Sequence, residues 1–132
     1  MPVFLNHDDA LVLLRDALAA SVRADAPDLS TRQMSILLRV YTVQSSHTVR
    51  ELSEVLNISK PAISRAVDRL EKLGYVRRRR NEYDRRSVRV EGTAKGNIFI
   101  MKFADQVSEA GRGLDSPTPF QAGIPQVSDG GF

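Results

Sequence analysis

Apolar residues recur every three or four positions in the first part of the chain, which is the spacing that places them on one face of a helix. Residues 7–25 have this pattern at Leu11, Leu14, Leu18 and Val22. Pro27 interrupts it, because proline disfavours a helical conformation in the residue before it. A second helix is predicted after a cap at Ser30 or Thr31, with an inner face formed by Met34, Leu37, Leu38 and Tyr41.

Two capped segments follow. Thr48 and Glu51 have the spacing of a capping box, and the core positions of this third helix are Leu52, Val55 and Leu56. After a turn at residues 57–58, Ser59 is predicted to cap a fourth helix that has Pro61 in its first turn and ends at Gly74. The inward stripe of this fourth helix consists of Ile63, Ala66, Val67, Leu70 and Leu73. The pattern indicates a helix-turn-helix.

The period changes to two after the fourth helix, which indicates two strands around a polar loop. Val76 is predicted to pair with the face of Val88 and Val90, while Arg89 and Glu91 point outward. A fifth helix is predicted over 93–111. Residues 115–132 are rich in proline and glycine and have no periodicity, so they are predicted to form a disordered tail.

This order of elements predicts a mainly α protein with a small β-wing. We expect a winged helix-turn-helix domain over residues 1–114, with about five helices and a two- to three-stranded hairpin sheet. The length of 132 residues fits one domain. The helices over about 7–25 and 93–112 flank the helix-turn-helix and the hairpin and are predicted to form a dimer.

Composition excludes several classes of function. The chain has no cysteine, so disulfides, thiol chemistry and cysteine-containing zinc sites are excluded, and two histidines are too few for a metal cluster without carboxylate ligands. No glycine-rich phosphate loop or nucleophile–base set is visible, so neither an enzymatic activity nor a cofactor is expected. No signal peptide or membrane span is visible, which predicts a cytoplasmic protein without a membrane partner.

Charge is distributed unevenly along the chain. Between Ser59 and Lys95 there are 12 Lys or Arg and 5 Asp or Glu, a net charge of +7, whereas the rest has 7 against 11, a net charge of −4. A basic block that coincides with a helix-turn-helix is typical of a protein that binds double-stranded DNA.

The fourth helix is predicted to enter the major groove, because a helix with one apolar stripe and a polar, basic opposite face fits a groove roughly 12 Å wide. The predicted contacts are Ser59, Lys60, Pro61, Ala62, Ser64, Arg65 and Arg69. Arg65 is the first candidate for a base contact, since a guanidinium can bond guanine at two points. For Arg69 and Lys72, simple solvation is an equal alternative.

The loop between the strands is bracketed by Arg77–Arg80 and Arg85–Arg86. Arginine at a loop tip suits a narrow minor groove, where the electrostatic potential is most negative. The predicted wing contacts are Arg78, Arg80, Asp84, Arg85 and Arg86, with Asp84 orienting a neighbouring arginine by a charge-assisted hydrogen bond. His47 is predicted to lie at the surface or an edge.

The first and fifth helices are apolar around more than one face. A small domain has too little core to cover both, so a second copy of the chain is the simplest partner, with a monomer of unusually thick core as the alternative. The predicted dimer interface consists of Leu11, Leu14, Leu18, Ile98, Phe99 and Phe103.

Three segments, Leu52–Val76, Asp84–Val90 and Thr93–Gly96, resemble the multiple-antibiotic-resistance regulator (MarR) family of winged-helix transcription factors. The resemblance implies a homodimer whose fourth helices enter successive major grooves while the wings reach the flanking minor grooves. It implies that Arg86 is the minor-groove arginine, with Arg85 beside it and Asp84 as its anchor, and it suggests control by a small, often aromatic effector. Residues 115–132 stand where the family usually has a sixth helix.

The sequence therefore predicts a sequence-specific transcriptional regulator, with repression of a palindrome-like operator as the commonest outcome in the family. A non-specific DNA-coating protein and a winged-helix protein-interaction module are the two alternatives.

Overall fold

The computed structural model describes residues 5–84 and 86–114. The elements in chain order are α1 (His7–Arg23), α2 (Thr31–Thr42), α3 (Val49–Leu56), α4 (Lys60–Lys72), β1 (Val76–Arg80), β2 (Val88–Gly92) and α5 (Ala94–Gly113). This is the predicted winged helix-turn-helix, and its sheet has two antiparallel strands, with one isolated bridge between Thr48 and Arg89. The predictions for Arg85 and for the tail over 115–132 lie outside the described residues.

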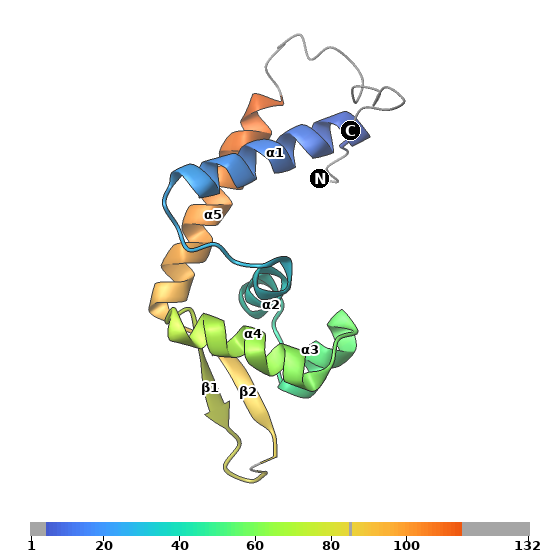
Figure 1. Ribbon diagram of the computed structural model, residues 1–132, viewed down its shortest axis with the longest axis vertical. Helices are drawn as coiled ribbons and strands as arrows, with labels where there is room; N and C mark the ends of the chain where they lie inside the picture. Colours follow the sequence, from blue (N-terminus) through green and yellow to red (C-terminus); the bar gives the residue numbers. More distant parts are fainter. Residues whose placement is uncertain (1–4, 85, 115–132) are drawn as a thin grey trace, which may run out of the picture. The chain divides into compact units, whose positions relative to one another are not determined.

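The described chain forms two compact units. One is Pro27–Lys102, which contains α2, α3, α4, the hairpin and the first turns of α5. The other contains α1 and the end of α5 from Phe103. Figure 1 follows the chain through these elements by colour.

The core of the 27–102 unit is built from the apolar stripes of its helices. The buried side chains of this core include Ile36, Leu37, Leu52, Ile63, Val67 and Leu70, and β1, β2 and α5 add Val76, Val90 and Ile100. Ile36 was missing from the predicted inner face of α2. Val55 was predicted in the core of α3, and this was wrong: the side chain is 47% exposed because α3 buries only the turn face that carries Leu52.

The helix ends follow the local signals in the sequence. Ser30 and Gln33 form a reciprocal capping box on α2, with hydrogen bonds of 2.9 and 3.1 Å. Ser59 accepts from the amide of Ala62 at the start of α4. Asn57 (φ 53°) makes the turn between α3 and α4, and Gly74 (φ 82°) follows α4, both in the left-handed conformation.

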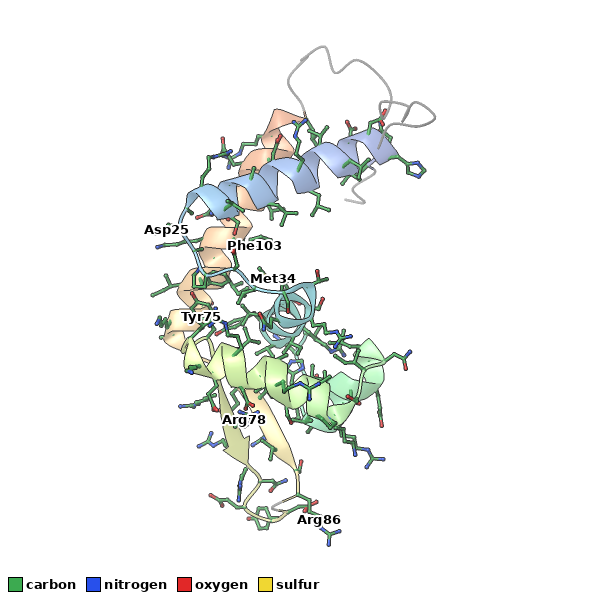
Figure 2. All side chains as sticks on the ribbon, in the orientation of Figure 1. Asp25, Met34, Tyr75, Arg78, Arg86 and Phe103 are labelled. Carbon is green, nitrogen blue, oxygen red and sulfur yellow. The ribbon has the colours of Figure 1, made fainter. Side chains whose placement is uncertain are left out.

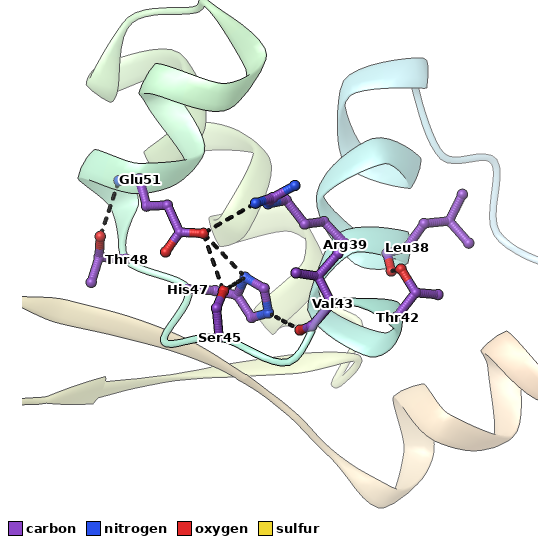
Figure 3. A network of polar contacts seen from close by, with 8 residues as sticks. All are labelled: Leu38, Arg39, Thr42, Val43, Ser45, His47, Thr48 and Glu51. Atoms are coloured by element: carbon purple, nitrogen blue, oxygen red, sulfur yellow. Dashed lines mark hydrogen bonds and ion pairs between the residues drawn. The ribbon is translucent and has the colours of Figure 1, made fainter.

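The capping box predicted at Thr48 is only half present. Thr48 accepts from the amide of Glu51, but the Glu51 carboxylate bonds Arg39 (3.3 Å) and Ser45 (3.2 Å) instead of returning to the cap (Figure 3). Glu51 therefore ties the start of α3 to the end of α2.

His47 is buried, with 5% of its surface exposed, so its predicted place at the surface was wrong. Its ring nitrogen Nε2 lies 2.7 Å from the carbonyl oxygen of Val43, and Nδ1 lies 3.4 Å from Ser45 Oγ (Figure 3). Its own carbonyl oxygen accepts from the amide of Val90 in β2. The imidazole is buried because the 43–48 loop folds back to join α2 to the wing.

The register of the hairpin places Val76 opposite Gly92, Arg78 opposite Val90 and Arg80 opposite Val88. Val76 therefore shares a face with Val88 and Val90, as predicted, but Arg78 lies on that same face, in the middle of it. The guanidinium of Arg78 therefore faces α4, and carboxylates of that helix pair with it.

The second unit presents an apolar stripe on α1. Ala17 is buried, whereas Leu11, Leu14, Leu18 and Val22 are each about half exposed or more and lie three or four residues apart.

None of the helices in the described part of the chain combines the length and the hydropathy that crossing a bilayer requires.

Candidate nucleic-acid interface

Three elements border one groove in the 27–102 unit, with a volume of about 590 Å³. The start of α3, the start of α4 and the wing contribute Thr48, Val49, Arg50, Lys60, Ser64, Asp84, Arg86, Ser87 and Val88. Four of the residues predicted to bind DNA are thus brought together here: Lys60, Ser64, Asp84 and Arg86. Since the positive ends of two helix dipoles open at this groove, it favours an anionic ligand.

Residues at the start of α3 were missed from the sequence. Thr48 and Val49 line the groove, and so does Arg50. Arg50 lies in the first turn of α3, where the helix dipole disfavours a cation, and its side chain reaches the carboxylate of Glu54 at 3.4 Å. A basic residue placed against the dipole was the signal that could have found it.

The outward face of α4 carries exposed cations. Lys60, Arg65 and Arg69 are exposed, and in the described part of the chain none of the three has a carboxylate within ion-pair distance. Ser64 is half-buried. Ala62 was predicted among the DNA contacts, but its side chain is buried because it belongs to the apolar face that also carries Ala66.

The run of four arginines in β1 divides by partner. Arg77 and Arg79 both reach Glu91 in β2, at 3.2 and 3.6 Å. Arg78 is 26% exposed and reaches Asp68 (2.6 Å) and Glu71 (3.0 Å) on α4. Arg78 was predicted to contact DNA, whereas in this structure its guanidinium forms ion pairs with carboxylates of α4.

The last residue of the run, Arg80, is exposed, and Arg86 is exposed at the wing tip, where Figure 2 shows its side chain directed away from the domain. Neither has an ion-pair partner among residues 5–84 and 86–114. Among the described residues of the wing, Arg80 and Arg86 are thus exposed cations without a carboxylate partner, open to an external anion.

The wing tip is held by side chains that accept backbone amides. Asn81 Oδ1 accepts from the amide of Tyr83 (2.9 Å), and Asp84 Oδ1 accepts from the amide of Arg86 (3.0 Å). The carbonyl oxygen of Asp84 also accepts from Ser87. Asp84 thus orients the main chain of Arg86 by an Asx-type turn, whereas a bond to a guanidinium was predicted.

The six predicted dimer residues separate into two groups. Phe99 stacks on Tyr75 with ring centroids 4.4 Å apart and belongs to the margin of the 27–102 core, and Phe103 is half-buried. The other four side chains, Leu11, Leu14, Leu18 and Ile98, are about half exposed. Burial of Tyr75 in this stack also raises the pKa of its phenol above the ordinary value.

No group of three or more His, Asp or Glu side chains is placed to hold a metal ion in the part of the chain that the structure describes.

Comparison with known proteins relates part of this chain to a family. Residues 28–87 match the model of the MarR family. The chain is 30% identical over 69 residues to the HTH-type transcriptional regulator PapX of Escherichia coli; the match covers 51% of this chain and 42% of that protein. The chain thus spans less than half the length of this relative.

Two solved structures have a similar fold. The structure of a MarR transcriptional regulator from Methanosarcina mazei Go1 has a TM-score of 0.62 and 28% identity, and the match covers 86% of this chain and 81% of that one. The S. aureus MepR–DNA complex has a TM-score of 0.66 and 18% identity, with 80% and 84% covered.

Proposed function

We propose that this chain is a transcriptional regulator of the MarR family that binds double-stranded DNA sequence-specifically, a proposal supported by the match of residues 28–87 to the model of that family. The observation that carries the proposal is the groove where the first turns of α3 and α4 meet the wing, with Lys60 and Arg86 both on its border. A surface that binds duplex DNA needs cations on a rigid convex element, such as a helix, and a second DNA-contacting element at a fixed distance from it.

In this proposal α4 enters the major groove. Arg65 is exposed and has no carboxylate partner in the described chain, so its guanidinium is available to a guanine edge. Lys60 and the first turn of α4 bind phosphate, and Arg50 provides a further phosphate contact from α3.

The wing reaches the adjacent minor groove through Arg86, with Arg80 beside it on β1. The Asx-type turn at Asp84 fixes the main chain of Arg86 before DNA arrives, which lowers the entropy lost on binding. Arg85 is predicted to act next to Arg86 and lies outside the described residues.

The functional unit in this proposal is a homodimer on a palindrome-like operator. The exposed stripe of Leu11, Leu14 and Leu18 on α1 has the spacing of a helix–helix contact, and Ile98 adds an exposed apolar side chain on α5. Binding at the operator would block access to a promoter, so repression is the expected outcome, with a small-molecule effector as its control.

The test is selection of bound duplexes from a random pool at near-physiological salt. An enriched inverted repeat with half-site centres about one helical turn apart supports a dimeric, specific regulator. Absence of enrichment, together with binding that disappears as salt rises, would support a DNA-coating protein. Failure to bind DNA at all would leave the protein-interaction module.

A further inference from the structure

Arg78 joins the wing to the recognition helix through four hydrogen bonds or ion pairs. Its guanidinium nitrogen Nη2 lies 2.6 Å from Asp68 Oδ1 and 3.0 Å from the carbonyl oxygen of Ser64, and Nη1 lies 3.0 Å from Glu71 Oε1. Its backbone amide donates to Glu71 Oε2 at 2.9 Å.

These partners lie along one face of α4. Ser64, Asp68 and Glu71 are spaced by four and three residues, so a single side chain spans about two turns of the helix. Because Arg78 is at the centre of β1, opposite Val90, movement of the hairpin relative to α4 must break at least one of these interactions. Figure 2 shows Arg78 between the hairpin and the helix.

We propose that Arg78 is a positioning residue, which fixes the wing relative to α4 so that both DNA-contacting elements are held at one spacing. We call the four contacts of Arg78 with Ser64, Asp68 and Glu71 the clamp. The role of the clamp at DNA rests on the proposed function, but the clamp itself is a property of the protein without DNA.

The clamp also reduces the negative charge on α4. Asp68 and Glu71 are the two carboxylates on α4, the helix proposed to lie against phosphates. The Arg78 guanidinium offsets one of these negative charges from inside the protein, so the cations Lys60, Arg65 and Arg69 remain available to DNA.

The interactions of Arg78 are poor candidates for a role in stability alone. Asp68 is 64% and Glu71 41% exposed, and ion pairs at such positions contribute little to the free energy of unfolding. A direct DNA contact is also disfavoured, because the guanidinium already donates to three acceptors. The contribution of Arg78 is therefore to fix the position of the wing relative to α4.

The first experiment measures the clamp without DNA. The chain has no cysteine, so spin labels can be placed at Lys72→Cys on α4 and Tyr83→Cys in the wing, with labelled chain diluted into unlabelled chain. Arg78→Gln should broaden the distribution of the distance between the labels. Arg79→Gln removes the same charge one residue away, where the partner is Glu91, and should leave the distribution unchanged.

An unchanged distribution in Arg78→Gln would overturn the inference. Should that variant fail to fold, Asp68→Asn weakens the 2.6 Å ion pair from the other side and should broaden the same distribution.

The second experiment measures binding to the selected operator and to random duplex. Arg78→Gln should weaken operator binding roughly tenfold more than Arg79→Gln, with similar small reductions on random duplex, because a mobile wing must be ordered on binding. The effect of Arg86→Ala should also be smaller in the Arg78→Gln background than in the Arg79→Gln background.

Equal reductions for Arg78→Gln and Arg79→Gln on both DNAs would show Arg78 to be an ordinary cation and would overturn its positioning role. If the chain has no sequence preference at all, the proposed function fails, whereas the distance measurement still decides whether the clamp exists.

Discussion

The hydroxyl of Tyr41 in α2 accepts a hydrogen bond from the backbone amide of Thr93, 52 residues later, at 2.8 Å. The same hydroxyl donates towards the carbonyl oxygens of Tyr75 (2.9 Å) and Thr93 (3.0 Å), which share its one proton. A single side chain thus satisfies the main chain at the two ends of the wing, where α4 gives way to β1 and where β2 gives way to α5.

We expect Tyr41→Phe to lower the free energy of unfolding by about 1–3 kcal/mol, because the partly buried amide of Thr93 loses its acceptor. Urea unfolding followed by circular dichroism measures the change. Tyr83→Phe removes a hydroxyl from a side chain that is 97% exposed and should change stability by less than about 0.5 kcal/mol. Equal effects of the two variants would contradict the role given to Tyr41.

Gly96→Ala is predicted to destabilise the protein by at least about 2 kcal/mol, since a Cβ at this position would overlap the Tyr41 hydroxyl and the backbone carbonyl of Tyr75. Gly113→Ala lies in the same helix with open space around it, and its effect should stay within about 0.5 kcal/mol. Thermal unfolding of both variants compares them directly. A well-tolerated Gly96→Ala would mean that α5 begins further from Tyr75 than the structure has it.

Asp84→Ala tests the turn at the wing tip, because the loss of charge and the loss of the turn change the affinity for DNA in opposite directions. Loss of a negative charge beside DNA should by itself strengthen binding, whereas loss of the acceptor for the Arg86 amide should weaken it. We expect weaker operator binding, by roughly three- to tenfold. Asp84→Asn retains the Oδ1 acceptor without the charge and should bind at least as tightly as the unmodified chain; fluorescence anisotropy measures all three.

Arg86→Ala should reduce the salt dependence of DNA binding, by about 0.9 in the slope of log affinity against log salt for each phosphate that the protein no longer neutralises. Arg77→Ala removes an arginine that already pairs with Glu91 at 3.2 Å, so its effect on the slope should be smaller. Titrations at several salt concentrations give the slopes. The same change of slope for both variants would refute the division of wing arginines into those that brace the hairpin and those that reach DNA.

The dimer interface is tested on the exposed stripe of α1. Leu14→Glu combined with Leu18→Glu should yield a folded monomer, because both side chains are about half exposed and their charge would have to be buried in a dimer. Light scattering measures the mass in solution. Arg23→Glu, on α1 but off the stripe, is the control and should leave the mass unchanged. A double variant that keeps the mass of a dimer would exclude this surface.

The features of the fold that depend on a few neighbouring residues were predictable from the sequence. The caps at Ser30 and Ser59, the left-handed residue at Gly74 and the apolar stripe of α4 were all predicted, and each depends only on residues within a turn or two. The winged-helix architecture followed from their order.

The predictions that were wrong depended on which other element would pack nearby. Val55 has the spacing of a core residue but is 47% exposed among the described residues, and His47 is buried because its loop folds back onto Val43 and Val90. Spacing within one segment cannot show either result.

The candidate site divides in the same way. Lys60, Ser64 and Arg86 were predicted and do border one groove, since the helix-turn-helix and the wing are local motifs in a known order. Arg50 was missed because its place in the groove depends on how α3 meets the wing. The contacts of Arg78 with Asp68 and Glu71 were not predicted, because these partners lie seven or more residues away on another element.

The alternation of β1 has a consequence for how such wings change in evolution or by design. Adjacent, chemically identical arginines differ in their contacts because the pleat turns Arg78 to the helix side and its neighbours Arg77 and Arg79 to the other side. Inserting or deleting one arginine in the run would turn the later residues to the opposite face, but another arginine would then stand at the inward position of Arg78, so the clamp would keep its guanidinium. The repetition of one residue type therefore makes the clamp tolerant of a one-residue change in the length of β1.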